Sequence, residues 1–197
     1  MTPDRLPRQL RFLTEIDRLK GIDRMISTIG GARRENSAEH SWHLAVMVPL
    51  LAEYAAEPID VRRVQQMLLI HDIVEIDAGD AFAFDEEAKR GQAEREARAA
   101  SRLFGMLPAD QAGEYEACWH EFEAGQTPDA RFAVALDRFQ GLLMNAGNGG
   151  GTWLIHSVSR ERVLVRMDPI REAAPGLWPV VLRVLDEVGL GAGPGDD

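Results

Sequence analysis

The chain has 197 residues, 45% of them hydrophobic, which suffices for one domain whose core needs neither disulfides nor bound metal for stability. Its formal net charge of −10 argues against a broad surface for nucleic acid or an anionic membrane, and leaves only local basic pockets for small anions. The single cysteine, Cys118, excludes an internal disulfide and fits a reducing compartment.

No stretch has the pattern of a targeting or membrane segment. Residues 1–8 lack the apolar core of a signal peptide. The most apolar stretch, residues 44–52, contains Pro49 and is far shorter than the roughly 20 residues that a membrane span needs. We therefore expect a soluble cytoplasmic protein that binds neither membranes nor nucleic acid.

Apolar residues near the N-terminus predict an amphipathic helix over residues 8–20 that packs on the core. They recur at helical spacing: Leu10, Leu13, Ile16 and Leu19. Residues 22–26 are expected to form a short turn of helix, and residues 30–34 a flexible loop. The simplest interpretation of Arg24 from its surroundings is a solvated surface residue, as for most arginines.

The next helix begins with a clear capping signal. Asn36 is followed three places later by Glu39, a pair typical of a helix start, and predicts a helix to about residue 56. His40 falls in the first turn, where the positive end of the helix dipole favours the neutral imidazole that can ligate a metal. His43 lies one turn further on and could chelate with His40, although a second helical histidine more often packs in the core or near the surface.

Asp60 is expected to cap a helix from residue 61, which carries an apolar stripe that turns polar at His71. Glu75 lies four residues after His71 and three after Asp72, so the three side chains crowd one end of the helix. Burial of this group without a cation would be costly, which makes a metal site the simplest explanation. The alternative is a frayed helix end with exposed acids.

Gly79 is expected to end this helix, with Asp80 in the loop that follows. The glycine-rich stretch 145–151 is interpreted as a loop that approaches a ligand or simply connects two helices. Further helices are expected over the ranges 85–104 with an interruption near Gly91, 109–123, 159–167 and 177–188. The fold class is therefore all-α, in a single domain over residues 1–197 with a disordered tail over about 189–197.

A further acid lies on the helix that is expected to begin after Thr127. The neighbours of Asp137 at three and four residues carry no positive charge: Ala133, Val134, Gln140 and Gly141. Arg138 is next in sequence but is expected to point away. Asp137 therefore needs a partner from elsewhere, and a metal ion would supply one.

These residues resemble a known family. The order His40, His71-Asp72, Asp137 is similar to the ligand order of the HD-domain metal-dependent phosphohydrolases, a superfamily of helical bundles. Further motifs resemble the branch that contains bacterial 5′-deoxynucleotidases: Glu39-His40-Ser41, His71-Asp72-x-x-Glu75 followed by Gly79-Asp80, Leu136-Asp137, and Gly150 to Trp153. The resemblance extends from Arg11 to about Val188.

The resemblance implies a divalent ion bound by four side chains: His40, His71, Asp72 and Asp137. It implies that Glu75 is the catalytic residue beside the metal, where it could orient a water molecule or shuttle its proton. Arg24 would contact the substrate phosphate, and Asp80 would help to recognise the sugar. Mixed nitrogen and oxygen ligands suit Co, Mn, Fe, Ni or Zn, with Mg also a candidate, so the sequence does not identify the metal.

We therefore expect a phosphohydrolase that removes the 5′-phosphate from nucleoside monophosphates, with deoxyribonucleotides favoured, and, by resemblance, a homodimer. Two alternatives stay open. One is an HD phosphohydrolase that acts on another phosphate ester or on a nucleoside diphosphate or triphosphate. The other is a nucleotide-sensing module that keeps the metal without turnover, against which the intact Glu75 and Arg24 argue.

Overall fold

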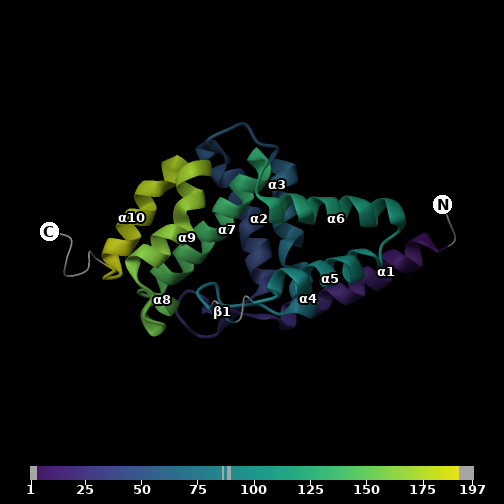
Figure 1. Ribbon diagram of the computed structural model, residues 1–197, viewed down its shortest axis with the longest axis horizontal. Coiled ribbons are helices and arrows are strands. Elements are labelled where there is room, and N and C mark those ends of the chain that lie inside the picture. Colours follow the sequence, from purple (N-terminus) through teal and green to yellow (C-terminus); the bar gives the residue numbers. More distant parts are fainter. Residues whose placement is uncertain (1–3, 86, 88–89, 191–197) are drawn as a thin grey trace.

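The computed structural model describes residues 4–85, 87 and 90–190, and this part of the chain is mainly helical, as expected (Figure 1). The α-helices are α1 (Arg5–Glu15), α2 (Ser37–Leu51), α3 (Val61–Ile70), α4 (Glu75–Ala78), α5 (Gln92–Phe104), α6 (Ala109–Ala124), α7 (Pro128–Gly147), α8 (Gly151–Ile155), α9 (Arg160–Ala173) and α10 (Trp178–Glu187). Short 3-10 helices are η1 (Ile16–Gly21), η2 (Ala52–Tyr54), η3 (His71–Val74) and η4 (Pro175–Leu177). Residues 191–197 of the expected tail lie outside the described residues.

Helix α7 forms the centre of the bundle. It packs against α2, α3, α6 and α9, and in Figure 1 it lies between the α9–α10 pair and helices α3 to α6. The Thr127 side chain accepts a hydrogen bond from the backbone N–H of Ala130, and Pro128 occupies the first turn, so the helix starts where the sequence indicates. Among the helices of the described ranges, none is long and apolar enough to cross a membrane.

The stretch from α3 to α4 is almost continuously helical, and the 3-10 turn η3 tightens its middle. Asp60 caps its start by accepting hydrogen bonds from the backbone N–H groups of Arg62 and Arg63. Gly79 ends it with a φ of 75°, a left-handed value that favours glycine, while its N–H bonds to the carbonyl of Glu75. A 3-10 segment inside a helical run often marks a functional position, and here it holds the His-Asp pair.

The expectation of helix over residues 22–26 is wrong. Residues 23–26 lie in strand β1 (Asp23–Ser27), which pairs antiparallel with β2 (Arg34–Asn36) and places Asp23 opposite Asn36. A stretch of five residues carries too little periodicity to separate strand from helix, and the pairing across the Gly30–Gly31 turn decides its state. Arg24 is the second residue of this strand.

The expected core face of the first helix is partly wrong. Leu10 and Leu13 are 53% and 59% exposed, whereas Phe12 and Leu19 are buried. The Phe12 ring packs edge-on against Tyr115 of α6, at 5.9 Å between ring centroids. Helix α1 has apolar residues on two faces, and the larger aromatic ring faces the core. The helix expected from residue 85 also differs, since α5 begins at Gln92, after Gly91.

The glycine-rich stretch is more ordered than a connecting loop. Helix α7 continues to Gly147, and α8 begins at Gly151. The Asn148 side chain donates to the carbonyls of Ser27 and Thr28 and accepts from the N–H of Gly30, at 3.1–3.2 Å. The Asn148 amide therefore links the β1–β2 turn to the end of α7 by hydrogen bonds. These bonds restrain the position of β1, the strand that contains Arg24.

Candidate active site

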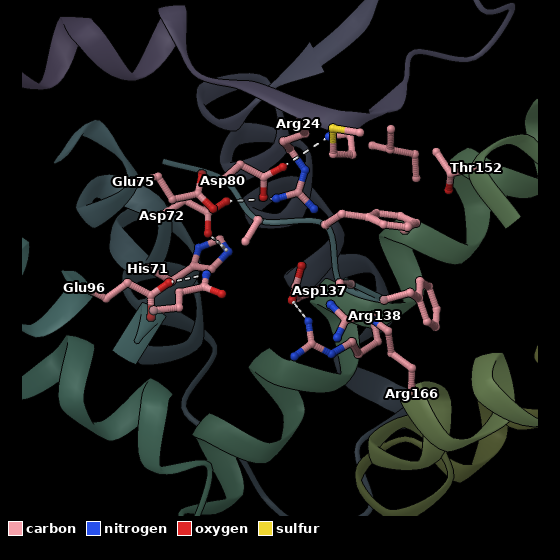
Figure 2. Close-up of a pocket in the computed structure, with 18 of the residues that line it drawn as sticks. Arg24, His71, Asp72, Glu75, Asp80, Glu96, Asp137, Arg138, Thr152 and Arg166 are labelled. Atoms are coloured by element: carbon pink, nitrogen blue, oxygen red, sulfur yellow. Dashed lines mark hydrogen bonds and ion pairs between the residues drawn. The ribbon is translucent and has the colours of Figure 1, made fainter. Parts of the chain in front are cut away.

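A cavity of about 460 Å³ opens where β1, η3, α4, α7 and α9 converge, and it contains most of the residues singled out in the sequence (Figure 2). Side chains from α5, α6 and the loop after Gly79 complete its wall. Charged groups of both signs line it, together with aromatic rings from the loop and from α6 and α8. Such a mixture suits a charged ligand with an apolar portion.

His40 is fully buried in the first turn of α2, where Asn36 and Glu39 form the expected capping box. Its Nε2 lies 3.0 Å from Asp137 Oδ1 and 3.8 Å from Asp72 Oδ2. Burial, followed by the positive charge of Arg24, lowers the pKa of His40 to about 4, so the ring is neutral at physiological pH. The sequence predicted a neutral ring from the helix dipole, whereas burial is the larger cause.

His71 and Asp72 lie side by side in η3, and both are buried. His71 Nδ1 lies 3.0 Å from the carbonyl oxygen of Leu68, an arrangement that places the proton on Nδ1 and leaves the Nε2 lone pair free. Nε2 is 3.0 Å from Asp72 Oδ1, and the charge of Asp72 outweighs burial and raises the pKa of His71, so this position favours a positive charge. A buried lone pair of this kind is suited to a cation.

Asp137 of α7 faces this pair across the cavity (Figure 2), and its carboxylate contacts two cationic or polar groups. One is His40, and the other is Arg138, whose guanidinium forms an ion pair with Asp137 Oδ2. The expectation that Arg138 points away is therefore wrong, because its long side chain spans the roughly 100° between adjacent helical positions. The charge of Arg138 and the hydrogen bond with His40 outweigh burial and hold the pKa of Asp137 well below its usual range.

The residues present fit a divalent metal ion. One donor atom each from His40, His71 and Asp72 lies within 4.8 Å of the others, and all three residues are buried. Asp137 falls outside this 4.8 Å group but approaches it through His40. Two neutral imidazoles and two carboxylates balance a charge of +2, and this donor set suits borderline divalent ions. His43 is not in the group, because its ring lies against Gln140, with 3.4 Å between Nδ1 and the amide nitrogen.

Arg24 is not a solvated surface residue. Its side chain is only 17% exposed, with Nη1 3.1 Å from Asp72 Oδ2 and Nε 3.5 Å from Glu35 Oε2. The sequence missed Glu35, a buried carboxylate whose pKa burial raises to about 6 and which accepts a hydrogen bond from Gln140 at 2.7 Å. In the sequence, only its position immediately before the Asn36 cap could have indicated that Glu35 lies near His40.

Glu75 and Asp80 both line the cavity on the side of Arg24. The Ser37 hydroxyl donates to Glu75 Oε2 at 2.5 Å, and the backbone N–H of Met25 donates to Asp80 Oδ2 at 3.2 Å. Burial, followed by the charges of Asp72 and Asp80, raises the pKa of Glu75 to about 9. A carboxyl group with this property can hold a proton at neutral pH.

The helical fold and the buried His-Asp cluster define a metal-dependent hydrolase of the HD-domain type. A family model described as an HD domain matches residues 16–178, and the chain belongs to this family of metal-dependent phosphohydrolases. A crystal structure of a predicted metal-dependent phosphohydrolase from Magnetospirillum magnetotacticum is 51% identical, with a TM-score of 0.90 over 95% of this chain and 96% of that chain.

Curated relatives include the human 5′-deoxynucleotidase HDDC2, which is 27% identical over 68% of this chain, and the match spans 65% of the human protein's own length. The 5′-deoxynucleotidase hdd1 of Schizosaccharomyces pombe is 25% identical over 66% of each chain. An HD-domain phosphohydrolase from Listeria innocua shares the fold alone, with 15% identity and a TM-score of 0.64 over 92% of this chain and 91% of that chain.

Proposed function

We propose that the protein is a 5′-nucleotidase that hydrolyses the phosphate monoester of nucleoside 5′-monophosphates. The observation that carries the proposal is the buried group of His40, His71 and Asp72, with Asp137 next to it, at the base of a cavity that also holds Glu75 and Arg24. In this proposal the four residues of the group hold one divalent ion. When bound, such an ion lowers the pKa of a water molecule and offsets charge on a phosphoryl group.

In the proposed reaction Glu75 handles the proton of the attacking water. The carboxyl group is fixed by the hydroxyl of Ser37, so it has one orientation toward the cavity. Burial and nearby acids raise its pKa to about 9, so the group holds a proton at neutral pH, and the charge of a bound cation would favour the carboxylate that accepts a proton from water. Glu75 would take the proton at a carboxylate oxygen and supply it to the leaving 5′-oxygen.

Arg24 would hold a phosphate oxygen in the same cavity. Its guanidinium is already oriented by Asp72 and Glu35, so its side chain need not be ordered when the substrate binds. Asp80 lies on the same side, and its carboxylate could accept a hydrogen bond from a sugar hydroxyl.

The preference for a nucleotide rests on the curated relatives and on the aromatic part of the cavity. Phe82 and Phe84, in the loop after Asp80, both line it, and their ring centroids are 5.6 Å apart. Aromatic faces of this kind stack against nucleobases without strong base preference. This fits a substrate with phosphate at the metal and a base toward the loop.

The test is phosphate release by purified protein from nucleoside 5′-monophosphates, with Mn²⁺, Co²⁺, Ni²⁺, Zn²⁺ and Mg²⁺ supplied in turn. We expect release from deoxyribonucleoside 5′-monophosphates and less from the 3′-monophosphates. Release only from nucleoside diphosphates or triphosphates would replace the proposal with another HD phosphohydrolase activity. Nucleotide binding without release under any metal would favour a sensor.

We also propose that the protein is a homodimer. Apolar side chains are exposed along two helices of the described chain: Leu6, Leu10 and Leu13 on α1, and Trp42, Val46 and Leu50 on α2. Each set recurs at helical spacing, so each forms a stripe that a second copy could cover. Light scattering coupled to gel filtration should give twice the mass of 21.9 kDa, and a monomer at micromolar concentration would contradict the proposal.

A further inference from the structure

Arg166 is a cation of the active-site cavity to which neither the sequence nor the proposed mechanism gives a role. It comes from α9, and its side chain lines the cavity. Figure 2 shows its side chain beside Arg138, on the side of Asp137 away from His71. Through this guanidinium, α9 contributes a positive charge to the cavity.

The charge of Arg166 is not matched by a protein carboxylate. Arg24 pairs with Asp72 and Arg138 pairs with Asp137, whereas Arg166 has neither an ion pair nor a hydrogen bond with any residue that the structure describes. Its nearest described aromatic contact is the ring of Phe84, with 6.0 Å from the guanidinium carbon to the ring centroid. A partly buried guanidinium without an anion is costly, and a ligand can supply the anion.

The charges around Arg166 also favour an anion at this position. Burial, followed by the positive charge of Arg138, lowers the pKa of Arg166 to about 10, because these effects outweigh the opposing charges of Asp137 and Asp80. Arg24 and Arg166 both line the cavity, and Figure 2 shows them on opposite sides of it. Glu96 also lines the cavity, but it lies beside His71 and away from Arg166 (Figure 2). It therefore does not neutralise the charge of Arg166.

We propose that Arg166 binds a second oxygen of the same phosphate group that Arg24 contacts, so that guanidinium groups from β1 and α9 hold the phosphate from two sides. This inference rests on the proposed function and extends it to a substrate class. A terminal phosphate monoester is a dianion near neutral pH, and Asp72 already offsets the charge of Arg24. The unpaired charge of Arg166 would therefore favour a dianionic monoester over a monoanionic diester.

The test measures binding of inorganic phosphate to the metal-loaded protein by isothermal titration calorimetry, without any need for turnover. Arg166→Met removes the charge but keeps an apolar stem that can cover Phe84. We expect the dissociation constant for phosphate to rise at least about 10-fold, since a hydrogen bond to a charged group is lost. Arg166→Lys should restore part of the affinity, because a point charge replaces the two-pronged donor. Arg171→Met, on the exposed part of the same helix, is the matched control and should bind phosphate normally.

Three results would overturn the proposal. Unchanged phosphate affinity in Arg166→Met, with weaker pyrophosphate binding, would place Arg166 at a second phosphate. An equal loss of affinity for an uncharged deoxynucleoside would show that the side chain acts by packing alone. Loss of bound metal in both Arg166 variants would show that it supports the fold of the site. Phosphate binding that depends on Arg166 in a protein without nucleotidase activity would instead refute the proposed function and leave this inference intact.

Discussion

Replacing Asp137 with Ala removes one proposed metal ligand and leaves the α3–α4 stretch that carries two others unchanged. Asp137 Oδ1 lies 3.0 Å from His40 Nε2, and the carboxylate also pairs with Arg138. The variant leaves that guanidinium without its partner, so its stability without metal should differ from that of the wild type. The informative quantity is therefore the stabilisation that the metal adds to each protein.

Loss of an outer-shell partner typically weakens metal binding about 10- to 100-fold, and loss of a ligand should cost at least about 100-fold. At free metal of about 100 times the wild-type Kd, the ion would add about 2.7 kcal/mol to the free energy of unfolding of the wild type and about 0.4 kcal/mol to that of the variant. For a chain of this size, about 1 kcal/mol shifts Tm by about 2–4 °C, so metal should raise Tm by about 5–11 °C in the wild type and about 1–2 °C in the variant.

Differential scanning calorimetry with and without metal measures this difference, and elemental analysis of desalted protein gives the metal content. Circular dichroism should show nearly unchanged helical content in Asp137→Ala. His43→Ala is the matched control, because His43 lies on the same helix as His40 but faces Gln140. Equal metal content in Asp137→Ala and the wild type would refute the site, and an equal loss in His43→Ala would show that His43 is also a ligand.

Three other substitutions test mechanism and architecture. Glu75→Gln should keep metal and substrate binding but slow kcat by about 10²- to 10⁴-fold, and near-normal turnover would remove Glu75 from proton transfer. Arg24→Ala should raise KM, with only partial rescue by Lys, whereas unchanged substrate affinity would remove Arg24 from the phosphate site. Asn148→Ala should lower the free energy of unfolding by about 1–3 kcal/mol in urea titrations, because its amide makes three hydrogen bonds to the backbone of the β1–β2 turn. A loss below about 0.5 kcal/mol would show that water replaces this amide.

The sequence was most informative where a signal is local. The caps at Asn36, Asp60 and Thr127 place the starts of α2, α3 and α7 correctly, because each side chain bonds to a backbone N–H two or three residues later. The ending at Gly79 follows from its positive φ. The polar end of the α3–α4 stretch is likewise visible as three titratable residues within five positions.

The sequence was least informative where contacts between distant segments decide the outcome. The strand state of residues 23–27 depends on pairing with residues 34–36, and the exposure of Leu10 and Leu13 depends on which face of α1 meets α6. The Asp137–Arg138 ion pair was missed because helical geometry sets the direction of the Cα–Cβ bond only. The position of a long guanidinium side chain also depends on its rotamer.

The sequence by itself determined the helical class, the main helix boundaries and, through its motifs, the family to which the chain belongs. These rest on bonds and periodicities within about four residues, which the order of amino acids encodes directly. Only the tertiary structure decided that Glu35 is buried beside Arg24 and that Arg166 of α9 reaches the cavity without a carboxylate partner among the described residues. Charge and burial at such positions depend on which distant helices pack together, and no single segment of sequence specifies that packing.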